Sequence, residues 1–339
     1  MPLKAPYPPS TAAVGGRPTV SVDVPITSVF LFLYILGAIG HMTILQINLR
    51  RGHKFLMSGI LFGFCMARIV TCIMRIVWAC YPTNVKVAIA ATIFVSAGVL
   101  LLLLINLIFA QRIIRAAHPH FGWHRALHWT FIVLYVLIAL MLVVVITATV
   151  QSFYTLNPNT HRIDRDLQLT TATYFMFVAF LPFPLVIVGL IVPRKTRVEK
   201  FGSGRWRTKI WILLITSTFL LLGSSFRAGT SFKNPRPIQH PAWYHAKWCF
   251  YFFDFTTEII VVYLYLLLRV DRRFYIPNGS KGPGDYVREG GAEEEKKKKP
   301  NSVHSMRPIL SEEEVFDDKE PENKRGSKDV ERNARPGSS

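Results

Sequence analysis

The chain has 339 residues, of which 50% are hydrophobic, with a mean hydropathy of +0.29 and a formal net charge of +19. This composition leaves two classes open, a large soluble domain and a polytopic membrane protein. The excess charge does not indicate nucleic-acid binding, because 24 of the 40 basic and 6 of the 21 acidic residues precede Arg269, beside the apolar segments. We expect it to attract anionic lipid of the cytoplasmic leaflet and expect no nucleic-acid partner.

Long apolar segments decide between the two classes. Each approaches or exceeds the roughly 20 residues that cross about 30 Å of hydrocarbon, and none shows the polar face of a soluble core helix. A helix satisfies its backbone hydrogen bonds internally, so it is the spanning element for such continuous segments. The sequence therefore predicts an all-α, polytopic membrane protein with seven transmembrane helices, at 26–49, 55–81, 87–113, 127–150, 169–192, 210–226 and 244–268.

Lysine and arginine residues predict the orientation and the limits of the membrane domain. They are more numerous in the connections after the odd-numbered helices, which places the N-terminus outside and the C-terminus in the cytosol. The predicted organisation is a disordered extracytosolic segment at 1–25, the seven-helix domain at 26–268, a turn-rich juxtamembrane segment at 269–286 and a disordered, charged cytosolic tail at 287–339.

An intramembrane charge cluster is predicted from helices two and seven, which carry Arg68, Arg75, Asp254 and Glu258. Each charge costs roughly 2.5–3.5 kcal/mol near the middle of a bilayer, so we expect partners for all of them. From the outer boundary, Arg75 and Asp254 lie about 10 and 15 Å deep, and Arg68 and Glu258 both lie about 21 Å deep. We predict the pairs Arg75–Asp254 and Arg68–Glu258. They form either a structural staple or a polar cavity for a ligand or an ion.

Other helices contribute candidate lining residues for such a cavity, namely His41, Asn106 and Ser224. The alternative for His41 is an interhelical hydrogen bond that fixes packing. The connection around 157–166 is predicted to be an outer turn with local charge pairing. Pro182 and Pro184 predict either a kink in helix five or a gap that neighbouring helices fill.

The connection before helix six is strongly basic and contains Arg194, Lys195, Arg197, Lys200, Arg205, Arg207 and Lys209. This connection is predicted to contact anionic lipid, and a cytosolic protein is predicted to dock at 193–209 and the tail. The alternative is that its basic residues only determine the orientation of the protein in the membrane. His120, His124 and His128 could share a helix face, but no carboxylate stands nearby. We therefore expect no metal site and no cofactor.

Short stretches of the sequence carry a family resemblance: GHM at 40–42, RGHKF at 51–55, FCMAR at 64–68, NLIFAQR at 106–112 and the juxtamembrane stretch at 274–286. They resemble a fungal family of seven-helix membrane proteins classed as a domain of unknown function. The resemblance spans about residues 26–286 and implies the architecture and a fungal origin. It implies no activity and no catalytic residue.

Better understood seven-helix families fit the sequence poorly. Helix three ends in Ala110-Gln111-Arg112, which differs from the acidic-Arg-Tyr triplet of rhodopsin-type receptors, and Lys247 lies at the outer end of helix seven, away from the depth a retinal lysine occupies. We favour a receptor-like or sensor-like membrane protein whose charge cluster is a lock or a ligand site. The alternative is a transporter or channel-like carrier of a lipid or small polar solute, and an enzyme is not expected.

Overall fold

The structure is a computed structural model that describes residues 5–9, 11–193, 198–280 and 282–286. The regular elements in these residues are helices, with the following bounds: α1 Val20–Arg50, α2 Leu56–Cys80, α3 Val85–Ala117, α4 Pro119–Gly122, α5 Arg125–Tyr154, α6 Pro158–Phe180, α7 Pro182–Ile191, α8 Trp206–Ser231, η1 Trp243–His245, α9 Lys247–Phe250, the π-helical η2 Tyr251–Thr256, α10 Thr257–Leu267 and α11 Val270–Arg273.

The predicted all-α class is confirmed for the described residues, and the seven predicted spans correspond to seven candidate membrane-spanning helices. Within the described residues, 7 helical segments are long and apolar enough to cross a membrane, with α6 and α7 forming one span and α9, η2 and α10 another. This arrangement is consistent with a multi-pass integral membrane protein. The predicted tail at 287–339 lies outside the described residues, as do Arg194, Lys195 and Arg197.

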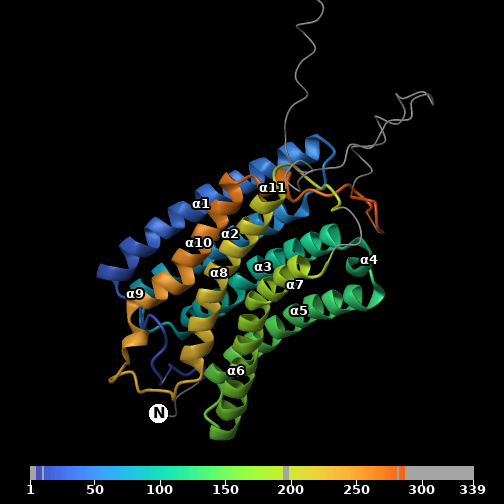
Figure 1. Cartoon of the computed structure of the whole chain (residues 1–339). Helices are drawn as coiled ribbons and strands as arrows, with labels where there is room; N and C mark the ends of the chain where they lie inside the picture. Colours follow the sequence, from blue (N-terminus) through green and yellow to red (C-terminus); the bar gives the residue numbers. More distant parts are fainter. Residues whose placement is uncertain (1–4, 10, 194–197, 281, 287–339) are drawn as a thin grey trace, which may run out of the picture.

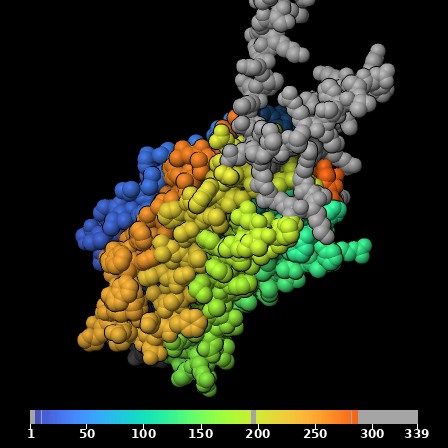
Figure 2. All heavy atoms as spheres, in the orientation of Figure 1, coloured from blue at the N-terminus to red at the C-terminus, as the bar shows by residue number. Residues whose placement is uncertain are grey.

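Packing places α3 at the middle of the bundle. It contacts α2 on one side and α5, α6, α7 and α8 elsewhere, while α1 packs against α2 and α10. Figure 1 shows α1 and α10 at one side of the bundle, and α5 with α6 at the other. In Figure 2, α8 (yellow) lies between α10 (orange) and the α6–α7 pair (green). The outward faces of α1 and α5 carry exposed apolar side chains such as Val29 and Val143, as expected for a surface against lipid.

The helices that begin furthest ahead of their predicted starts are α1 and α6. The first starts at Val20, so the expected boundary after residue 25 falls inside α1, and Asp23 is fully buried. The other early start is that of α6, at Pro158, which makes the predicted turn at 157–166 wrong. The side chain of Asn157 caps this helix by accepting a hydrogen bond from the backbone of Asn159 at 3.0 Å, and a proline at the first helical position suits a helix start.

The kink predicted at Pro182 is present. Helix α6 ends at Phe180 and α7 restarts at Pro182, because proline cannot donate the next backbone hydrogen bond. The break interrupts the fifth span, whose second part, α7, packs against α3 and α8.

The bundle has two ends, which we call the N-terminal end, where α1 begins and 232–246 lies, and the C-terminal end, where α11 lies. At the C-terminal end, aromatic rings form a closed layer in which Phe109 stacks on Phe274 at 4.2 Å between centroids and Phe201 meets Tyr286 at 5.8 Å. Arg112 donates to the backbone carbonyl of Phe274 and ties this layer to α3. Burial raises the pKa of the nearby Glu199, and a hydrogen bond from the backbone of Gly284 opposes that rise.

Gly202 should be indispensable at the C-terminal end. Its φ is +55°, and a Cβ there would lie 2.3 Å from the backbone oxygen of Arg273. Gly279 is a matched control, because its φ is +87° but a Cβ there would meet nothing within 4 Å. We expect Gly202→Ala to lower the thermal unfolding midpoint of the detergent-solubilised protein clearly more than Gly279→Ala does, since only the first adds a backbone clash to the strain. Equal effects would contradict the close packing of 198–205 on α11.

Candidate functional site

Arg68 on α2 and Glu258 on α10 are both buried, and they pair as predicted. Arg68 donates from Nε to Oε2 and from Nη2 to Oε1 of Glu258, both at 2.6 Å. The two side chains are 0% and 1% exposed. The remaining nitrogen, Nη1, donates to the backbone carbonyl of Val95 at 3.2 Å, where α3 passes close by. This bidentate geometry is the strong form of an arginine–carboxylate contact.

The second predicted pair, Arg75–Asp254, is wrong. Asp254 pairs instead with Arg227 of α8, whose Nε lies 2.5 Å from Oδ1 of Asp254. Arg227 also reaches Glu258, with Nη2 2.8 Å from Oε1. The Glu258 carboxylate is therefore shared by two guanidinium groups from two helices. We call Arg68, Arg227, Asp254 and Glu258 the core charge network, in which two positive and two negative charges balance.

Arg75 belongs to a separate cluster nearer the N-terminal end. Its Nη2 donates to Oδ1 of Asp23 at 2.8 Å, and its guanidinium carbon lies 4.1 Å from the centroid of the Phe250 ring. Lys247 contacts the other oxygen of Asp23, and the hydroxyl of Tyr251 donates to Oδ1 at 2.8 Å. Two cations therefore share one carboxylate, which leaves this N-terminal charge cluster with an excess of positive charge.

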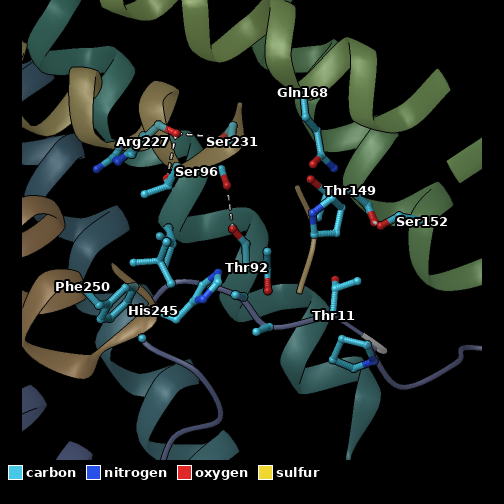
Figure 3. A pocket seen from close by; sticks show the side chains of 18 of the residues that line it. Thr11, Thr92, Ser96, Thr149, Ser152, Gln168, Arg227, Ser231, His245 and Phe250 are labelled. Atoms are coloured by element: carbon cyan, nitrogen blue, oxygen red, sulfur yellow. Dashed lines mark hydrogen bonds between the residues drawn. The ribbon is translucent and has the colours of Figure 1, made fainter. Parts of the chain in front are cut away.

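A cavity of about 1030 Å³ opens between these charges and the N-terminal end. It is bounded by α3, α5, α6, α8 and the segments 7–17 and 235–247, and its wall includes Arg75, Arg227 and Asp254. Figure 3 shows Arg227 and Gln168 on different sides of it, with Ser96 of α3 near Arg227 and hydrogen-bonded to the carbonyl of Thr92. Hydroxyl and amide groups that line it include those of Thr92, Ser96, Thr149, Ser152, Gln168, Ser224, Thr230 and Ser231.

The N-terminal segment lies along the cavity and makes a turn, in which the backbone of Gly16 donates to the carbonyl of Ala13 at 2.9 Å. Three backbone hydrogen bonds hold it, from Tyr7 to Phe153 at 2.8 Å, from Ala12 to Arg236 at 2.8 Å and from Gly15 to His245 at 3.1 Å. The segment was predicted to be a disordered tail. It contributes lining residues to the cavity, and its Gly15, at a φ of +78°, lies against the ring of Phe250 where a Cβ would come within 2.7 Å.

His245 offers a hydrogen-bond donor at the cavity. Its Nδ1 accepts from the backbone of Ala242 at 3.0 Å, so the proton of a neutral ring lies on Nε2. Burial, with the positive charge of Arg236, lowers the pKa of His245, so the ring is neutral at neutral pH. Figure 3 places this imidazole beside the N-terminal segment.

The remaining predicted site residues have structural roles or lie elsewhere. Nε2 of His41 lies 3.3 Å from the carbonyl oxygen of Val262, the interhelical contact that was the alternative for this residue. Asn106 donates to the hydroxyl of Ser217 at 3.1 Å within the core. Lys209 of the basic connection is buried and donates to the carbonyl of Phe201 at 2.6 Å, so this lysine stabilises the connection and does not face the membrane surface. Of the candidate lining residues, Ser224 alone borders the cavity.

Sequence reasoning missed Asp23 and Arg227. The first was assigned to the outer segment and the second to the outer boundary of helix six. The sequence offers only a weak signal for Arg227, because the apolar pattern ends at Phe226, although α8 continues to Ser231.

Residues 199–275 match the model of a family described as a protein of unknown function (DUF3112). The match covers α8 to α11 and therefore includes Arg227, Asp254 and Glu258, but neither Arg68 nor Arg75. Searches of curated proteins and of solved structures found no match.

Gly98 allows the core charge network to pack against α3. A Cβ at this position would lie 2.7 Å from Cζ of Arg68, whereas a Cβ at Gly63 of α2 would meet nothing within 4 Å. We expect Gly98→Ala to destabilise the protein by about 1–3 kcal/mol through overpacking. Gly63→Ala should be neutral or slightly stabilising, because alanine has the higher helix propensity. Thermal unfolding of both variants in the same detergent measures the difference, and a tolerated Gly98→Ala would contradict the position of Arg68.

Proposed function

We propose that this multi-pass membrane protein is receptor-like or sensor-like, and that a ligand in the cavity acts on the core charge network. The observation that carries the proposal is that Arg227 and Asp254 belong to both features. A molecule that hydrogen-bonds to either side chain changes the balance of charges at Glu258. Few surface features of a membrane protein have such direct access to buried charges.

The last span supports this coupling. Asp254 lies in the π-helical turn η2, directly before the α-helical turn that carries Glu258. Single π-helical turns inside longer helices occur frequently at functional sites, where one extra residue per turn changes which side chains face inward. A shift of η2 toward regular α-helix would rotate Asp254 relative to Glu258 and would move α10 and α11.

Carrier activity is the alternative. The cavity lies toward the N-terminal end, and the buried aromatic layer of Phe109, Phe201, Phe274 and Tyr286 packs at the other end of the described bundle. A carrier would have to open this layer, whereas a receptor only has to shift it. The packing therefore favours the receptor-like function.

The proposed orientation places the N-terminal end outside the cell or in the lumen, and the C-terminal end in the cytosol. Lys200, Arg205 and Arg207 are exposed near the C-terminal end, as the positive-inside rule requires of a cytosolic face. We propose that this face contacts anionic lipid and a cytosolic protein partner. The resemblance of several stretches to a fungal seven-helix family supports the proposal of a fungal origin.

Filling the cavity with a side chain tests the coupling without a known ligand. Ser96→Trp places an indole in the cavity from α3, and Val143→Trp is the control, because Val143 is 60% exposed on the outer face of α5. We expect Ser96→Trp to change backbone hydrogen exchange of η2, α10 and α11 in the protein reconstituted in nanodiscs, and Val143→Trp to leave it unchanged. A change confined to the helices around position 96, with α10 and α11 unaffected, would contradict the proposal.

A further inference from the structure

Several buried polar groups at the cavity make no hydrogen bond within the described protein. They are both carboxylate oxygens of Asp164, the hydroxyl of Ser224 and Nε of Arg75, and all three residues line the same cavity. A buried polar group without a partner costs free energy, roughly 1–3 kcal/mol or more when it is charged, and native structures keep few of them. Because four such atoms, from three residues, border one cavity, they indicate a ligand with complementary groups.

Asp164 is the negative end of this set. It lies on α6, is 1% exposed, and precedes Gln168 by four residues, so both side chains occupy the same helix face. Figure 3 shows Gln168 pointing into the cavity toward Thr149. The adjacent Arg165 does not neutralise Asp164, because its guanidinium donates to the carbonyl of Lys233 at 3.1 Å. A buried carboxylate accepts hydrogen bonds only, and a primary ammonium supplies three donors and the opposite charge.

The positive end lies at Arg75. Nη2 of Arg75 is used by Asp23 and by the carbonyl of Gly15, but Nε is unused. Lys247 adds a second cation to the same carboxylate, so the N-terminal charge cluster can accept one more anionic group. Nε2 of His245 adds a donor at the same wall. A carboxylate or phosphate fits these donors.

The two ends lie on different walls. Arg75 is on α2 and Asp164 is on α6, and α3 packs between them and contacts both helices. Hydroxyl groups of α3 and apolar side chains such as Val95, Val99 and Phe175 line the space between the two ends. A ligand that reaches both must carry its charges at opposite ends of a spacer.

We propose that the cavity binds a zwitterion, with its primary ammonium at Asp164 and its carboxylate or phosphate at Arg75 and His245. This inference rests on the proposed function, because it names the class of ligand for the same cavity. Two sources share this chemistry, a soluble amino acid or peptide-like molecule and the head group of an aminophospholipid. The cavity of about 1030 Å³ has room for either.

The test measures binding to the full-length protein in nanodiscs with probes of graded length. The probes are ω-amino carboxylates with one to seven methylene groups, and the one-ended controls are alkylamines and alkanoates of equal length. Lysophosphatidylethanolamine represents the lipid source, with lysophosphatidic acid as its amine-free control. We expect one zwitterionic class to bind about tenfold or more tightly than its one-ended controls, and that class identifies the source.

Asp164→Asn should remove this preference and lower the affinity for the zwitterion to that of the amine-free control. Asp166→Asn is the matched control, because Asp166 is exposed and outside the cavity lining, and it should bind like the unmodified protein. The probe series on the unmodified protein decides the question even if Asp164→Asn fails to fold. Binding of one-ended probes with equal affinity would overturn the zwitterion and leave the receptor-like proposal standing. Absence of binding by every probe would count against both.

Discussion

The carboxylate of Glu258 is the constraint on which the arrangement of this bundle depends. Buried at 1% exposure, it needs compensation for the water it has lost, and it takes that compensation from Arg68 on α2 and Arg227 on α8. Neither arginine can withdraw without leaving an uncompensated buried charge. These ion pairs therefore fix the positions of α2, α8 and α10 relative to one another. Helix α3 packs closely against them, because its Gly98 leaves room for the guanidinium of Arg68.

The same carboxylate connects the cavity to the rest of the fold. Arg227 is 22% exposed on its side chain, unlike the fully buried Arg68, and it borders the cavity. Asp254 borders it as well, from a π-helical turn. The core charge network therefore has two parts. Arg68 and Glu258 form a buried part on the side of α2, and Arg227 and Asp254 form an accessible part that borders the cavity. This division explains how a structural ion pair and a ligand-responsive site can occupy the same four residues.

The sequence predicted much of the fold and part of the candidate site. The hydrophobicity of the segments identified the seven candidate spans. The depth of Arg68 and of Glu258 below the outer boundary identified them as partners. Both quantities can be obtained by counting residues along a single helix. The prediction of the pair Arg75–Asp254 failed for two reasons. The depth of a residue along its helix does not say which neighbouring helix it faces. The observed partners, Asp23 and Arg227, also lie outside the spans that were predicted from apolar composition. Polar first turns hid the start of α6, and with it Asp164. The cavity is bounded by helices far apart in sequence, so no local pattern could predict it.

Charge reversal at Arg68 and Glu258 tests the shared carboxylate most directly. The measurement is the yield of folded protein for Arg68→Glu, Glu258→Arg, the double variant and the double variant with Arg227→Gln added. A simple two-residue pair would regain its yield in the double variant. The shared carboxylate predicts that the double variant stays impaired, because the arginine at position 258 then faces Arg227, and that adding Arg227→Gln recovers part of the yield. Full recovery in the double variant alone would contradict the account.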